Sequence, residues 1–168
     1  ILIFAWSLKG MGDALEISTF VSNTVGSGAS TSVILPAVLF LVAIFLSFST
    51  GTSWGTFAIL VPIATAMFPG ADNLQMMIIT VSAVLAGAVC GDHISPISDT
   101  TVMSSAGAQS NHINHVTTQM QYAAVVAVVS FIGYMIAGFV HIWWVVLGIS
   151  LILLLAVLTV IKKIASRE

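Results

Sequence analysis

The sequence has little charge of either sign. Only 6% of its 168 residues are charged, whereas 58% are hydrophobic and the mean hydropathy is +1.12. A soluble domain carries about 25% charged residues, so this composition excludes a water-soluble enzyme, a nucleic-acid-binding protein and a disordered chain. It predicts an integral membrane protein instead.

Basic residues are missing from the whole interior of the chain, since no lysine or arginine lies between Lys9 and Lys162. Two acidic residues, Asp92 and Asp99, are nevertheless embedded in apolar sequence within that interval. A carboxylate in a low-dielectric environment is costly unless it is paired or neutralised. Each aspartate must therefore hold a proton, hold a cation, or meet a base from another part of the protein.

Other common features are also scarce. The single cysteine, Cys90, excludes an internal disulfide. No signal peptide is visible and the first residue is not methionine. The opening apolar run, residues 1–8, is shorter than the roughly 20 residues that cross a bilayer. We therefore expect the C-terminal part of a longer transporter, cut within a helix, whose N-terminal half is missing here.

Apolar runs separated by small polar segments predict an all-α polytopic membrane protein fragment. Residues 1–32 are expected to hold the end of a helix, an interfacial helix over 13–21 and a loop over 22–32. Residues 33–68 are expected to form a hairpin of two apolar helices, with Pro36 in the first turn of the first helix. The hairpin is either re-entrant or a full crossing followed by a half-helix. Its polar tip contains Thr50, Gly51, Thr52, Ser53 and Gly55.

The second half of the chain predicts a broken helix over 74–106, an inner polar segment over 107–121, and two transmembrane helices within 122–161. Small residues at Ala83, Gly87 and Gly91 predict close helix packing. The cluster Lys162, Lys163 and Arg167 places the C-terminus in the cytoplasm by the positive-inside rule. The hairpin then enters from outside, and residues 112–115 lie inside.

The break in the helix over 74–106 is the candidate site. Pro96 has no N–H, so the Asp92 carbonyl loses its helical donor. Non-helical backbone at membrane depth survives only where it lines a cavity or is buried in protein. Carboxylates, hydroxyls and freed carbonyls form an all-oxygen set suited to a hard cation such as Na⁺. The predicted ion-binding residues are Asp92, Asp99, Ser95, Ser98, Thr100 and Thr101, of which Asp92 and Asp99 are the predicted metal ligands.

Simpler interpretations stay open for several of these residues. Asp99 could cap a helix starting at Thr100, and Asp92 could cap the turn after Gly91. Ser95 and Ser98 could be packing hydroxyls, like those between membrane helices. At the hairpin tip, Gly51 and Gly55 satisfy a GxxxG packing motif as well as a binding loop, and Trp54 is read as a packing residue.

Three histidines are candidates for proton handling. His93, beside Asp92, is either a proton relay or a pore-wall residue. His112 and His115 are either sensors of cytoplasmic pH or ordinary solvated side chains. A zinc site is not expected, because two histidines without a nearby thiol fall short of four ligands.

Four motifs together carry a family resemblance: residues 51–56 (GTSWGT), 91–101 (GDHISPISDTT), 104–108 (SSAGA) and 112–119 (HINHVTTQ). They resemble the C-terminal half of NhaC-type Na⁺/H⁺ antiporters. The resemblance implies a transporter of the bacterial inner membrane, with a re-entrant hairpin and a discontinuous transmembrane helix in each of two inverted repeats. Asn114 and Gln121 depart from the family pattern, in which an acidic residue and a proline are common.

A site that is neutral with either H⁺ or Na⁺ exchanges one for the other, so the expected function is Na⁺/H⁺ antiport rather than enzymatic catalysis. The expected partners are Na⁺, H⁺, the lipid bilayer, the missing half and a second copy in a homodimer, with no nucleic acid and no cofactor beyond the transported Na⁺. The family resemblance also allows a transporter of small organic acids, malate/lactate type, or of amino acids. A remote alternative is an intramembrane aspartyl protease, although Val89 stands where such enzymes carry glycine.

Overall fold

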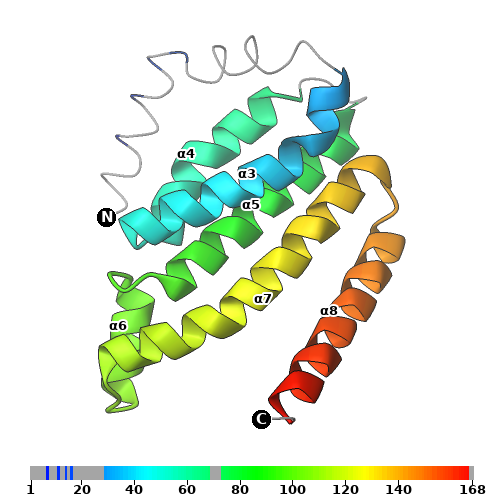
Figure 1. The fold of residues 1–168 in the computed structure, drawn as a ribbon. Helices are drawn as coiled ribbons and strands as arrows, with labels where there is room; N and C mark the ends of the chain where they lie inside the picture. Colours follow the sequence, from blue (N-terminus) through cyan, green and yellow to red (C-terminus); the bar gives the residue numbers. More distant parts are fainter. Residues whose placement is uncertain are drawn as a thin grey trace.

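The computed structural model describes residues 29–68 and 73–166, together with the isolated positions Ser7, Met11, Ala14 and Glu16. These residues form helices without strands (Figure 1). The helices are α3 (Ala29–Thr50), α4 (Ser53–Ala66), α5 (Leu74–Ile94), α6 (Asp99–Gly107), α7 (His112–Phe139) and α8 (Trp143–Ala165). In the described ranges, α3, α5, α7 and α8 are long and apolar enough to cross a membrane, whereas α4 is shorter. The all-α, polytopic prediction is confirmed.

Helices α3 and α5 lie side by side at the centre of the bundle (Figure 1). A Cβ added to Gly87 would collide with the Phe40 carbonyl oxygen and lie 3.0 Å from the Ala43 Cβ. One turn further on, a Cβ on Gly91 would collide with the Ile44 carbonyl oxygen. The predicted small-residue stripe is thus confirmed as the surface that lets two helix backbones touch.

Helix α4 folds back against α5 and completes a small apolar core with α3. Leu39 of α3, Leu60 of α4 and Val84 of α5 are buried together in this core. The turn between α3 and α4 is limited to Gly51 and Thr52, because α3 continues to Thr50 and α4 already begins at Ser53. The predicted polar tip is therefore shorter than expected, and its remaining hydroxyls are presented from helix ends.

Helix α5 ends at Ile94 because the sequence that follows cannot continue it. Ser95 is extended, with φ −74° and ψ 129°, as is typical of a residue before proline. Residues 95–98 are non-helical and α6 starts at Asp99, so the predicted break is confirmed. In Figure 1 this break and the α3–α4 turn lie at the same end of the bundle.

Helices α7 and α8 cover one side of this core. Gly138 of α7 contacts the backbone of α3 so closely that an added Cβ would collide with the Val33 carbonyl oxygen. The Tyr134 hydroxyl donates a hydrogen bond of 3.1 Å to the Ser82 carbonyl of α5. Helix α8 packs on α7, where a Cβ on Gly133 would lie 2.7 Å from the Ser150 Oγ.

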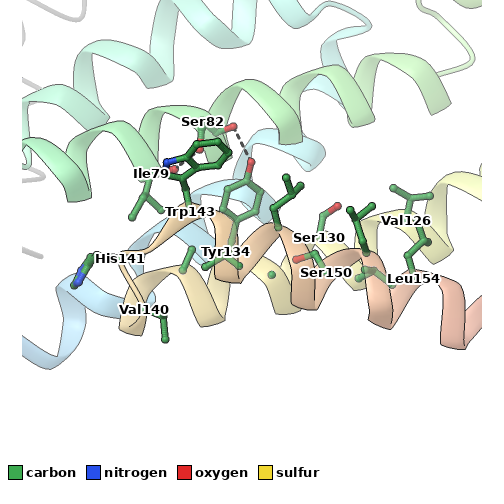
Figure 2. A pocket seen from close by; sticks show the side chains of 16 residues that line it. Ile79, Ser82, Val126, Ser130, Tyr134, Val140, His141, Trp143, Ser150 and Leu154 are labelled. Atoms are coloured by element: carbon green, nitrogen blue, oxygen red, sulfur yellow. Dashed lines mark hydrogen bonds between the residues drawn. The ribbon is translucent and has the colours of Figure 1, made fainter.

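A cavity of about 440 Å³ lies between α5, α7 and α8 (Figure 2). Its lining is mostly apolar, with hydroxyls from Ser82, Ser130 and Ser150. Neither aspartate of the predicted site lines it. The cavity is therefore a feature of helix packing, separate from the predicted site.

Several predicted boundaries were wrong by one or more turns. Helix α3 begins at Ala29 within the predicted loop, so Pro36 lies in the helix interior rather than in its first turn. Helix α7 begins at His112, so the polar residues up to position 121 belong to a helix of 28 residues. Hydrophobic periodicity does not locate these helix ends. The polar residues that flank each apolar run can continue the same helix, because no helix breaker separates them from it. The predicted interfacial helix over 13–21 lies outside the described residues.

Candidate ion-binding site

The hairpin tip and the helix break contact each other directly. Gly51 adopts a left-handed φ of +68°, which favours glycine. A Cβ at this position would also lie 2.8 Å from the Ile97 Cγ1 and 2.9 Å from the Ile97 carbonyl oxygen. The tip therefore needs glycine both for its turn and for its contact with the break.

The Asp92 carboxylate lies at this junction, near the end of α5, and only 7% of the residue is exposed. Its Oδ2 accepts a hydrogen bond of 3.0 Å from the Ser53 hydroxyl at the start of α4. Its Oδ1 accepts a hydrogen bond of 2.6 Å from the Ser98 hydroxyl in the break. The structure thus brings together one residue from each of three predicted groups: the aspartates, the tip and the break hydroxyls.

The hydrogen bonds continue from Asp92 to the second aspartate through Thr100. Because Ser98 gives its proton to Asp92, the Thr100 hydroxyl donates to Ser98 Oγ across 2.7 Å. The Thr100 backbone N–H donates to Asp99 Oδ1 at 2.8 Å. Asp99 and Asp92 are therefore linked by this chain of groups rather than by direct contact.

Asp99 differs sharply from Asp92 in its surroundings. It is the first residue of α6 and is exposed on the described part of the chain. Its carboxylate accepts the Thr100 N–H in the first turn of α6, but α6 begins at Asp99 and its N-cap residue is Ser98, so the interpretation that Asp99 caps a helix starting at Thr100 was wrong. Asp92 caps nothing, because it lies within α5.

Among the described residues, the hydrogen-bond partners of the Asp92 carboxylate are neutral hydroxyls. Lys162 and Lys163, the lysines of the described residues, lie in the last turn of α8, which packs on α7. The Ser53 and Ser98 hydroxyls stabilise the carboxylate without neutralising it. A proton or a bound cation would neutralise it, and each hydroxyl oxygen also has lone pairs that can face a cation.

The prediction that the break offers free backbone carbonyls was wrong for four of them. The Asp92 carbonyl accepts the Ser95 N–H at 3.2 Å, and the Ser95 carbonyl accepts the Ser98 N–H at 3.3 Å. Thr101 donates its hydroxyl to the His93 carbonyl, and His112 contacts the Pro96 carbonyl. Local turns and side chains replace the donors that the helix lost, as buried backbone groups require. These four carbonyls are therefore already hydrogen-bonded, and we assign the candidate cation site to side-chain oxygens.

The remaining predicted residues stabilise the junction instead of facing the carboxylate. The Ser95 hydroxyl donates to the Phe48 carbonyl of α3 at 2.7 Å, which ties the break to the hairpin. The Thr50 hydroxyl bonds the Leu46 carbonyl within α3. Thr52 precedes α4, and its carbonyl accepts the Thr56 hydroxyl.

The tip glycines do not form a shared helix-packing face. Gly51 lies in the turn, whereas Gly55 belongs to α4. A Cβ on Gly55 would meet the Thr52 Cγ2 at 3.0 Å, an atom of its own segment. Trp54 is exposed and its ring lies edge-on to Phe57 at 5.8 Å.

Sequence reasoning missed Ser47, because it lies in an otherwise apolar run. The residue is fully buried one turn before the tip, and its Oγ has no hydrogen-bond partner among the described residues. Its carbonyl accepts the Gly51 N–H at 2.8 Å, and the neighbouring Phe48 contacts both Ser95 and the Gly91 backbone. A buried hydroxyl one turn before the tip therefore has no hydrogen-bond partner among the described residues.

The three candidate histidines occupy different environments. His93 is exposed. His115 is half-buried, and its Nε2 is buried without a partner among the described residues. His112 bonds both Ser105 and the Pro96 carbonyl, so it is not an ordinary solvated side chain.

On the expectation that this site binds Na⁺, we predict that Ser98→Ala raises the KM for Na⁺ of the full-length protein by at least about tenfold, because it removes an oxygen that can face the cation as well as a hydrogen bond to the buried carboxylate. Ser49→Ala is a matched control, since that hydroxyl is exposed and bonds only its own helix. Initial rates against Na⁺ concentration in proteoliposomes provide the measurement. Equal KM values for the two variants would contradict a role of Ser98 at the site.

Comparison with known proteins gives consistent results. Residues 1–139 match the Na⁺/H⁺ antiporter family. An uncharacterised protein of Haemophilus influenzae is 44% identical over 97% of this chain and 31% of its own length. A Bacillus subtilis protein named malate-2H⁺/Na⁺-lactate antiporter is 32% identical over 66% of this chain and 23% of its own length. A Haemophilus influenzae protein named as an uncharacterised Na⁺/H⁺ antiporter is 40% identical over 49% of this chain and 18% of its own length.

The chain spans less than a third of the length of these curated relatives. No solved structure matches it.

Proposed function

The chain belongs to the Na⁺/H⁺ antiporter family, and we propose that the full-length protein exchanges Na⁺ for H⁺ with Asp92 as the shared binding group. The observation that carries the proposal is a buried carboxylate held by two neutral hydroxyls, with lysines of the described residues only at the end of α8. The family points to a transporter, and therefore away from the aspartyl protease alternative.

Exchange follows because the site is neutral with either H⁺ or Na⁺ bound. With a proton on Asp92 the group is neutral and the Ser53 and Ser98 hydroxyls need not donate to it. With Na⁺ bound, the carboxylate stays charged, and the two hydroxyl oxygens turn toward the cation as ligands. The state with neither is disfavoured by burial, so one ion leaves as the other arrives.

Asp99 is proposed as a second proton or cation group in series with Asp92. The Thr100 amide and hydroxyl connect it to Ser98, and Ser98 connects to Asp92. Its exposure on the described chain suits a group that first meets an ion from solution or from the rest of the protein.

We further propose a location in the bacterial inner membrane with a cytoplasmic C-terminus. Lys162 and Lys163 lie in the last turn of α8, which favours that end on the inner side. The hairpin tip, the break and the start of α7 then face the inner half of the bundle. A homodimer and pairing with a second, inverted half are predictions that follow from the family resemblance alone.

A second candidate function is Na⁺- and H⁺-coupled exchange of a small organic acid. It is favoured by the relative named as a malate-2H⁺/Na⁺-lactate antiporter. The single arginine of the sequence, Arg167, lies at its end. The described residues therefore offer hydroxyls and helix N-termini, but no guanidinium, to a carboxylate substrate.

Proteoliposomes containing the full-length protein separate these two functions. An outward Na⁺ gradient is expected to acidify the lumen without any organic anion present, because H⁺ enters as Na⁺ leaves. The uptake of labelled malate and lactate is expected to equal the uptake by protein-free vesicles. Proton movement that requires malate or lactate would overturn simple Na⁺/H⁺ exchange and establish the second candidate.

A further inference from the structure

The helix break is connected to the start of α7 by a histidine that bonds through both ring nitrogens. His112 Nε2 lies 2.7 Å from the Pro96 carbonyl oxygen. His112 Nδ1 lies 2.9 Å from the Ser105 Oγ of α6. One side chain therefore joins three successive elements: the break, α6 and α7.

The donor and acceptor roles follow from the chemistry of the partners. A carbonyl oxygen only accepts, so Nε2 must carry the proton toward Pro96. In the neutral ring, Nδ1 accepts the Ser105 hydroxyl proton. In the charged ring, Nδ1 donates to Ser105, whose hydroxyl then donates to the Val102 carbonyl at 2.9 Å. Both contacts of His112 are therefore compatible with either protonation state.

The location of Pro96 explains how its contact with His112 affects the site. Pro96 and Ile97 form the turn between Ser95, which bonds α3, and Ser98, which bonds Asp92. The backbone of this turn has no helix to hold its carbonyls. Fixing the Pro96 carbonyl therefore restricts the position of Ser98, and with it one of the two hydroxyls on the Asp92 carboxylate.

We propose that His112 is a positioning residue that holds the break in its cation-binding geometry and ties the site to α7. The inference rests on the proposed function of Asp92. When only a fraction of molecules has the binding geometry, the apparent affinity falls by that fraction. Loss of the His112 contact therefore weakens cation binding but leaves the saturated exchange rate unchanged.

The test is the Na⁺ dependence of exchange by the full-length protein in proteoliposomes. His112→Ala is expected to raise the KM for Na⁺ about two- to tenfold, the range for one lost neutral hydrogen bond, with a maximal rate within twofold of wild type. His115→Ala is the matched control, because it removes the same ring one turn along α7, and its Nε2 bonds none of the described residues. It is expected to keep the wild-type KM.

Two further variants keep the test decisive if the alanine variant folds poorly. The amide nitrogen of glutamine lies about as far from the backbone as the Nε2 of histidine. The amide nitrogen of asparagine lies about as far from it as the Nδ1 of histidine. His112→Gln is therefore expected to keep a KM near wild type, and His112→Asn to raise it like alanine. Equal KM values for these two variants would overturn the proposal.

A double-mutant cycle tests whether His112 acts through the break. Once Ser98→Ala has removed the hydroxyl that His112 positions, His112→Ala is expected to raise the KM by a smaller factor than in the wild-type background. Equal factors in both backgrounds would overturn the proposal. Active Asp92→Asn would refute the proposed function itself, whereas inactive Asp92→Asn with a wild-type KM for His112→Ala would refute this inference alone.

Discussion

Asp92→Asn in the full-length protein is expected to reduce Na⁺/H⁺ exchange to the rate of protein-free liposomes. Asparagine cannot take up the proton or supply the negative charge that Na⁺ must balance, while its size is nearly unchanged. Its side chain also keeps one acceptor for the Ser53 and Ser98 hydroxyls, so the fold around it is largely preserved. Proton flux driven by a Na⁺ gradient provides the measurement.

Asp99→Asn is the comparison variant for this experiment, because it makes the same chemical change on the same segment at the proposed second group. Its carboxylate is exposed on the described chain, where charge contributes less to binding. We expect an increase in the KM for Na⁺ of at most about fivefold, which corresponds to the roughly 0.2–1 kcal/mol of an exposed charge interaction. Wild-type exchange by Asp92→Asn would contradict the assignment, and inactivation by Asp99→Asn alone would transfer it to Asp99.

The second large effect is expected from Gly87→Ala, on the stability of the protein. The added methyl would collide with the Phe40 carbonyl oxygen, which belongs to the backbone of α3 and cannot rotate away. Helices α3 and α5 must separate to accept it, and overpacking of this kind costs about 1–3 kcal/mol, occasionally more. Unfolding in mixed micelles at increasing denaturing detergent measures the loss.

Gly148→Ala is the control for Gly87→Ala, since a Cβ at position 148 meets nothing within 4 Å in the described chain. The same glycine-to-alanine change in a helix is then expected to leave the free energy of unfolding unchanged or slightly higher. Equal destabilisation by both variants would show that the α3–α5 contact does not depend on the glycine.

The sequence was sufficient to predict which polar residues mark the helix break, because membrane burial constrains polar groups strongly. Asp92 and Ser98 stand out against apolar sequence, and Gly91 and Pro96 mark the end of a helix. The contact between tip and break depends on Gly51. The need for glycine at this position becomes clear only in the structure, where Ile97 lies beside it. The pairing of Ser53 with Asp92 therefore came from the structure.

What the sequence could not predict are contacts between distant positions that satisfy individual backbone groups. The Pro96 carbonyl takes its donor from His112, and the Phe48 carbonyl takes one from Ser95. Either bond depends on how helices dock, which no local pattern encodes. The same limitation explains why Asp92 and Asp99 looked equivalent in sequence: their spacing is visible there, but their burial depends on α3 and α4.

The central claim is that Na⁺ and H⁺ compete for the Asp92 carboxylate, and proton release on Na⁺ binding tests it most directly. Purified full-length protein in a weakly buffered detergent solution is titrated with NaCl, with choline chloride as the control, and released protons are counted with a pH indicator. The account predicts Na⁺-dependent proton release by the wild type and none by Asp92→Asn. Undiminished release by Asp92→Asn would contradict it.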